Sequence, residues 1–152
     1  MPPACKSCDE RTNRSEDMRY RWLLVLFYGL ILAIVSLLPS GTGPLNGWDA
    51  SLSPSLQNLL HFPAYTVLVC LVLIALAKPA KPTGAWPIAL SAAACFVYGV
   101  LLECLQAAGI PGRFGSVSDV LWNTAGVAAG VCVWMLFRKC FKPHTCPGEK
   151  PT

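Results

Sequence analysis

Four long apolar windows are the feature of this sequence that most limits how it can fold. They are Trp22–Leu38, Leu59–Ala77, Trp86–Gln106 and Val120–Phe137. A helix rises about 1.5 Å per residue, so windows of this length match the hydrocarbon core of a bilayer. Only 13% of the residues are charged, whereas soluble domains usually carry about 25%. The sequence therefore predicts an all-α integral membrane protein with four transmembrane helices.

The windows leave room for one membrane domain and two short tails. We expect residues 22–137 to form the membrane domain, residues 1–21 the N-terminal tail and residues 138–152 the C-terminal tail. The N-terminal tail is polar and mixed in charge, which predicts that it is mostly disordered. The first window is expected to be retained as a helix, because the residues after it show no signal-peptidase cleavage pattern. The expected loops are Pro39–Ser55, Lys78–Pro82 and Ala107–Ser118.

The positions of the basic residues predict the orientation of these helices. Eleven of the twelve Lys and Arg residues lie in the two tails or in the Lys78–Pro82 loop. Cytoplasmic loops of membrane proteins carry an excess of Lys and Arg, so both termini are expected in the cytoplasm. The net charge of +4 is therefore a topology signal, and we expect no nucleic-acid partner. The predicted location is the plasma (inner) membrane, with the lipid bilayer as the main partner.

Polar residues recur at the ends of three windows that this topology places outside the cytoplasm. They are His61, Tyr65, Glu103, Gln106, Arg113, Asp119 and Asn123. Six of them form pairs at i,i+3 or i,i+4 spacing, which places both members of a pair on one helix face. Ionisable groups are expensive at membrane depth and commonly mark functional sites. The seven residues are therefore the candidate site.

Most of these residues also have a structural explanation when taken singly. Asp119 lies where it would cap a helix, and Ser116-Val117-Ser118-Asp119 resembles a capping box. Glu103 would form an ion pair with Arg113. Asn123 would form interhelical hydrogen bonds, as would Gln106. Because all of these residues are predicted to lie at one depth, we favour a site.

No metal or cofactor is expected at the candidate site, because metal-ligand spacing is absent outside the tails. Four cysteines lie in the tails, and with a nearby histidine they could form a zinc site. These residues are Cys5, Cys8, Cys140, Cys146 and His144. Reactive or incidental thiols are the favoured interpretation. Cysteines inside the windows are expected to behave as small hydrophobic residues.

The polar residues and their spacing resemble the VanZ-like family of small membrane proteins. The resemblance rests on Asn58-Leu-Leu-His61-Phe-x-x-Tyr65, Glu103-x-x-Gln106, Arg113 and Asp119-x-x-x-Asn123-x-x-Gly126-x-x-x-Gly130. It extends from the first window to the end of the fourth. Members often have Asp-Lys where this chain has Gln57-Asn58, so its preference for a charged partner is expected to differ.

The resemblance implies a role at the cell envelope. The family takes its name from a member linked to reduced susceptibility to the glycopeptide antibiotic teicoplanin, so antibiotic resistance is an implied effect. The seven polar residues correspond to the family's characteristic positions. The resemblance assigns no catalytic role to these residues.

Two functions of different class are consistent with these residues. In the first, the site binds a lipid-linked cell-wall precursor or an anionic lipid headgroup. Arg113 would contact phosphate and Glu103 would position it, because a guanidinium matches phosphate geometry. In the second, a membrane enzyme uses His61 and Glu103 as acid–base groups on a lipid-linked envelope precursor. We favour binding, because no nucleophile stands out in the sequence.

Overall fold

The structure, a computed structural model, describes residues 6–38, 54–77, 83–109 and 116–140. These residues form four helices: α1 (Lys6–Leu37), α3 (Pro54–Leu76), α4 (Ala85–Gly109) and α5 (Val117–Cys140). Side chains are described for residues 16–38, 59–77, 83–109 and 116–138. No strand occurs in these ranges, so the all-α fold class is confirmed.

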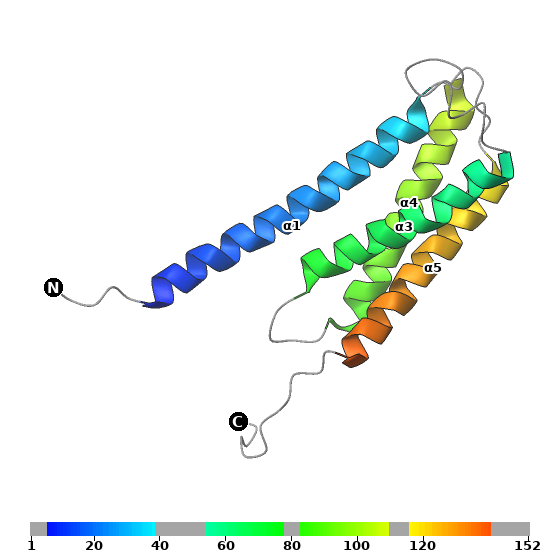
Figure 1. Ribbon diagram of the computed structural model, residues 1–152. Helices are drawn as coiled ribbons and strands as arrows, with labels where there is room; N and C mark the ends of the chain where they lie inside the picture. The colour runs from blue at the N-terminus through cyan, green and yellow to red at the C-terminus, as the bar shows by residue number, and fades with distance from the viewer. Residues whose placement is uncertain (1–5, 39–53, 78–82, 110–115, 141–152) are drawn as a thin grey trace.

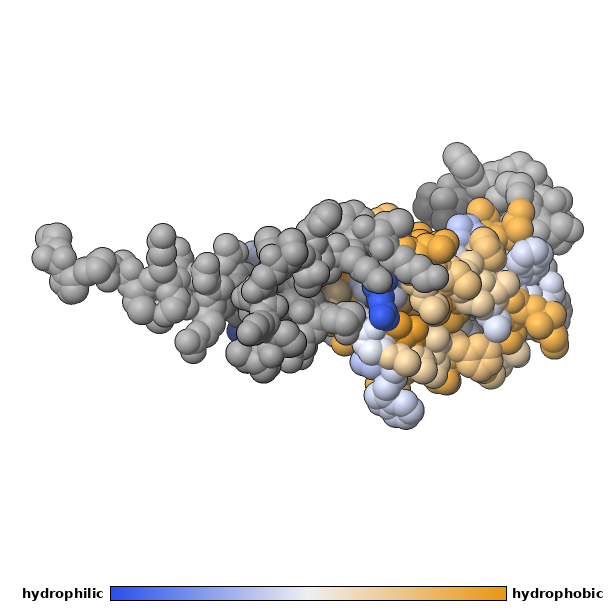
Figure 2. Space-filling view, turned by 90° about the horizontal axis from the view of Figure 1, so that it is seen from below, coloured by the Kyte–Doolittle hydropathy of each residue, from blue (hydrophilic) through white to orange (hydrophobic). Residues whose placement is uncertain are grey.

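Every helix in the described part of the chain contains a stretch long and apolar enough to cross a membrane. These stretches are Glu16–Leu37, Leu59–Leu76, Ala85–Gly109 and Val117–Arg138. Apolar side chains cover much of the described surface of the bundle in Figure 2. Leu26, Leu90 and Leu136 are examples of exposed apolar residues in the described helices, with 60–66% exposure. The chain is a multi-pass membrane protein, because lipid is the solvent that suits such a surface.

The helices run up and down in a bundle (Figure 1). The largest interface joins α3 to α5, with α4 packed against both and α1 against α3 and α4. Val69 and Leu73 of α3 are fully buried in the core. Tyrosines attach α1 to this core: the Tyr28 hydroxyl donates to the Ala64 carbonyl, and the Tyr98 hydroxyl donates to the Gly29 carbonyl.

Two glycines of α5 allow it to lie directly against the backbone of α3. A Cβ at Gly130 would meet the Val69 side chain and would lie 2.8 Å from the Thr66 carbonyl oxygen. A Cβ at Gly126 would meet the Phe62 carbonyl oxygen. Small residues four apart are a common device for close helix approach in membranes. Thr66 adds a hydrogen bond across this interface, because its hydroxyl donates to the Gly126 carbonyl at 3.0 Å.

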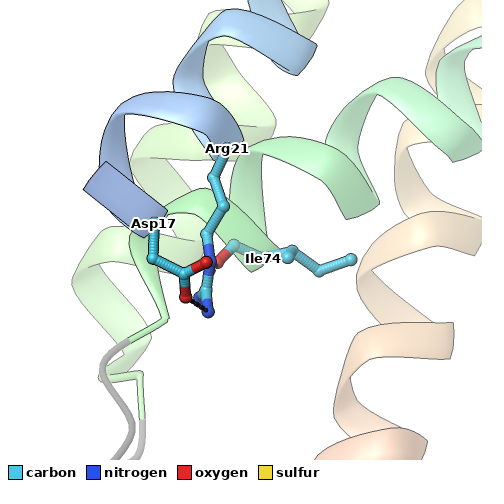
Figure 3. Close-up of polar contacts among 3 residues, drawn as sticks. All are labelled: Asp17, Arg21 and Ile74. Atoms are coloured by element: carbon cyan, nitrogen blue, oxygen red, sulfur yellow. Dashed lines mark hydrogen bonds and ion pairs between the residues drawn. The ribbon is translucent and has the colours of Figure 1, made fainter. Parts of the chain in front are cut away.

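The prediction of disorder before the first window is wrong for Lys6–Arg21, which form the first half of α1. The sequence between Lys6 and Gly29 contains neither Gly nor Pro, so nothing in it breaks a helix. Arg21 also holds the chain in place, as Figure 3 shows. Its guanidinium lies 2.9 Å from the Asp17 carboxylate one turn away and 3.4 Å from the Ile74 carbonyl of α3.

The other helices also extend past the predicted windows. α3 begins at Pro54 and α4 ends at Gly109, each a few residues into an expected loop. Pro suits the first position of a helix, where an N–H has no partner inside the helix. Of the expected loops, residues 39–53, 78–82 and 110–115 lie outside the described residues.

Ser116 caps the N-terminus of α5. Its side-chain oxygen accepts a hydrogen bond from the Ser118 N–H at 3.1 Å, and its carbonyl accepts from the Asp119 N–H at 3.0 Å. These bonds satisfy N–H groups that have no partner within the helix. The structure therefore shows Ser116 as the N-cap, but its side chain bonds the second helical N–H and not the third, which the predicted capping box would bond.

The close approach of α3 and α5 predicts that a single methyl group at their interface destabilises the fold. We expect Gly130→Ala to lower the free energy of unfolding by about 1–3 kcal/mol, because the new Cβ has no room against the α3 backbone. Gly109→Ala is the matched control, since a Cβ there would meet nothing within 4 Å. Thermal unfolding in detergent measures both. Equal melting temperatures would contradict the interface.

The Ser116 cap gives a second prediction. Ser116→Ala is expected to lower stability by about 1 kcal/mol, because the Ser118 N–H loses its acceptor. Ser118→Ala keeps this backbone donor and is expected to have little effect. The same thermal measurement compares the two alanine variants, and a larger loss in Ser118→Ala would show that the cap is assigned to the wrong serine.

Candidate functional site

Polar side chains from three helices meet near one end of the bundle. His61 of α3, Glu103 of α4 and Asp119 of α5 each bring a nitrogen or oxygen atom to within 4.8 Å of the others. Glu103 is 5% exposed and Asp119 9% exposed, although both are carboxylates inside an apolar bundle. We call these three residues, together with Asn123, the polar cluster.

Asn123 joins the polar cluster through His61. Its side-chain oxygen lies 3.1 Å from His61 Nδ1. With Nδ1 as the protonated nitrogen, the ring donates this bond and the lone pair of Nε2 remains available. Asn123 is only 2% exposed, and its Nδ2 has no hydrogen-bond partner among the described residues. The Asn123 side chain therefore orients the imidazole through its oxygen, while its Nδ2 remains a buried donor without a partner among the described residues.

Glu103 connects α4 to the start of α5. Its Oε2 accepts a hydrogen bond from the Ser116 N–H at 3.4 Å. In a capping box this N–H would be bonded by the side chain at the third helical position, which here is Asp119. Because Glu103 of α4 accepts a bond from the N-cap residue of α5, the cap and the polar cluster are directly connected. A helix N-terminus also favours nearby negative charge.

Gly99 leaves the space that two of the predicted site residues fill. A Cβ at Gly99 would lie 3.0 Å from the Tyr65 ring and 3.2 Å from Asn123 Nδ2. Tyr65 is 3% exposed and belongs to the hydrophobic core of the bundle. It packs beneath the polar cluster, next to Asn123. Gly99 lies one turn before Glu103 on the same helix face.

Gln106 is directed to a different neighbour. Its Nε2 donates to the Ser36 carbonyl of α1 at 2.7 Å, so it connects α4 to α1. Arg113 lies outside the described residues. The structure thus brings four of the seven predicted residues into one cluster and places Tyr65 beside it. It shows an interhelical hydrogen bond for Gln106.

Two features of this site were missed from the sequence. The prediction contained no group of metal-ligand type outside the tails, yet His61, Glu103 and Asp119 form one across three helices. Local spacing cannot reveal such a group, because its members are far apart in the chain. The role of Gly99 was also missed. Its position four residues before Glu103 places both on one helix face, which could have indicated that Gly99 lies beside the site.

The charges of the polar cluster limit its chemistry. Two carboxylates at this separation repel each other in a medium of low dielectric constant, so a cation or a shared proton between them is favoured. An imidazole beside them can accept a proton or bind a metal ion. The arrangement is therefore suited to holding a cation, moving a proton or binding a polar headgroup.

The cysteines inside the described spans include two with little exposure. Cys95 is buried, and Cys70 is half-buried with its thiol 3.6 Å from the Gly130 carbonyl. Cys104 and Cys132 are exposed free thiols. The tail residues proposed to bind zinc have no described side chains, so that hypothesis remains a prediction.

Comparison with known proteins identifies the family of this bundle. No curated protein and no solved structure matches the chain. A family model described as VanZ/LLP1 matches residues 7–138. This range contains all four described spans and every residue of the polar cluster. The match covers most of the 152 residues, and the chain therefore belongs to the VanZ/LLP1 family.

Proposed function

We propose that the polar cluster binds the headgroup of a cell-envelope lipid or of a lipid-linked cell-wall precursor. The observation that carries this proposal is the meeting of four polar side chains from three apolar helices, three of them buried and His61 half-buried. Retaining buried carboxylates in a bilayer costs stability, and such groups typically serve a binding or transport function. On this proposal the protein acts in the plasma membrane, with the polar cluster at the extracytoplasmic side and both termini in the cytoplasm.

The depth of the polar cluster supports a headgroup ligand. Glu103 lies six residues before the end of α4 at Gly109, which corresponds to about 9 Å along the helix axis. Asp119 lies in the first turn of α5. A polar headgroup at the membrane interface can reach side chains at this depth, whereas a ligand in the aqueous phase would have to enter the bundle.

Arg113 completes the proposed recognition. It is the one Lys or Arg in the sequence that lies outside the tails and the Lys78–Pro82 loop. It follows Glu103 in the chain and precedes Asp119, so it lies between two segments that lead to the polar cluster. A guanidinium binds phosphate through two parallel hydrogen bonds, which makes it the candidate for contact with a phosphate group of the ligand.

Membrane catalysis is the second candidate, and the proximity of His61 to Glu103 favours it. An imidazole beside a carboxylate is a common general acid–base arrangement. This function requires turnover of a lipid-linked precursor, whereas the binding function requires only its retention. Incubating purified protein with such a precursor and following the precursor by mass spectrometry distinguishes the two.

The proposal predicts that removing one buried charge abolishes function. In a Gram-positive host, we expect the wild-type protein to reduce susceptibility to teicoplanin. We expect Glu103→Gln to return it to the value of the empty vector, because the amide lacks the negative charge that positions Arg113. Vancomycin is tested in parallel, and membrane levels are matched by blot.

Glu16→Gln is the matched control for this experiment. Glu16 lies in the exposed first half of α1, away from the polar cluster, and undergoes the same change from carboxylate to amide. It is expected to retain the wild-type effect. Full protection by Glu103→Gln would contradict a functional role for the cluster, and no protection by wild-type protein would contradict the link to teicoplanin.

A further inference from the structure

We infer that His61, Glu103 and Asp119 bind a divalent transition-metal ion of the zinc class. One imidazole and two carboxylates are ligands that zinc accepts, with an open position left for water or another ligand. This inference departs from the sequence-based expectation that the site holds no metal. It rests on the geometry of the polar cluster and is independent of the proposed function.

The distances within the polar cluster are close to those of a metal site. The three candidate ligand atoms lie within 4.8 Å of one another. Ligand atoms around one tetrahedral zinc ion lie about 3.3 Å apart, as bond lengths near 2.0–2.1 Å require. Binding of an ion therefore requires the three side chains to draw closer together.

Asn123 gives a second, separate indication of a ligand. A histidine that binds metal usually has its other ring nitrogen held by an oxygen atom, and the Asn123 oxygen lies 3.1 Å from His61 Nδ1. Asn123 Nδ2 is buried without a hydrogen-bond partner among the described residues. A metal-bound water or ligand oxygen near the cluster would supply an acceptor for this donor.

A divalent ion also suits the charge of the polar cluster. Two ionised carboxylates and one divalent cation are together neutral, which lowers the cost of holding the carboxylates in an apolar bundle. The bound ion would then attract an anionic oxygen at its open position. That last role rests on the proposed function, because it supplies the positive charge that a phosphate-bearing headgroup requires.

Metal binding can be tested on the purified full-length chain. Cys5, Cys8, Cys140 and Cys146 are replaced by serine so that the tails cannot hold zinc, and the affinity tag contains no histidine. The protein is stripped with a chelator and titrated with Zn²⁺ against a fluorescent zinc indicator. We expect one tightly bound zinc ion per chain, with visible absorption bands when Co²⁺ replaces it.

Three variants locate the ion. His61→Gln and Asp119→Asn each remove one ligand and are expected to abolish tight binding. Asn123→Ala removes the residue that orients the imidazole and is expected to weaken binding by about 10–100-fold. Glu16→Gln is the matched control and should bind as the parent does.

Thermal unfolding guards against misfolded variants, because an ion that binds only the folded protein raises the melting temperature. Zinc should raise the melting temperature of the parent and of Glu16→Gln, but not that of folded His61→Gln. The absence of stoichiometric zinc in the parent overturns the inference, as does equal affinity in all four variants. No lipid or antibiotic is present, so failure here is distinct from failure of the proposed function.

Discussion

The close approach of α3 and α5 is the contact on which the rest of this structure depends. Gly126 lies against the Phe62 carbonyl, one residue from His61. Asn123 lies three residues before Gly126 and thus on nearly the same face of α5. The backbone contact therefore sets the separation at which Asn123 and His61 form their hydrogen bond. In a membrane this contact is made by van der Waals packing, because lipid tails are as apolar as the helix surfaces.

The polar cluster is held in place by groups that belong to the ends of helices. Glu103 bonds the backbone of Ser116, which in turn caps α5. The position of Glu103 therefore depends on the start of α5, and the start of α5 depends on Glu103. Such shared contacts keep carboxylates fixed where lipid would otherwise disfavour them. Functional sites commonly retain groups of this kind at a cost in stability.

Hydropathy predicted the fold of the described residues because each span is a continuous apolar run. Charge and polarity predict disorder between Lys6 and Arg21, whereas these residues form a helix. Charge and polarity do not prevent a helix when Gly and Pro are absent. The first residues of α3 were likewise predicted as loop, because the segment before the second window is rich in Gly and Pro. Pro54 is nevertheless a good first residue of a helix.

The candidate site was predicted less completely than the fold. Spacing along each helix correctly indicated that His61, Glu103 and Asp119 face a common region. It could not show that Gln106 bonds α1 or that Tyr65 packs into the core, because the rotation of each helix is set by packing with its neighbours. Gly99 and the glycines of α5 determine that packing, and their neighbours are known only once the helices are assembled.

A double-mutant cycle on His61 and Asn123 tests most directly whether residues from different helices form one cluster. The free energies of unfolding of wild-type protein, His61→Ala, Asn123→Ala and the double variant are measured in the same detergent. Contact across the α3–α5 interface predicts a coupling energy of about 0.5–1.5 kcal/mol, since residues that share a hydrogen bond are not additive. Additive losses would mean that the two side chains do not meet, and the polar cluster as described would not exist.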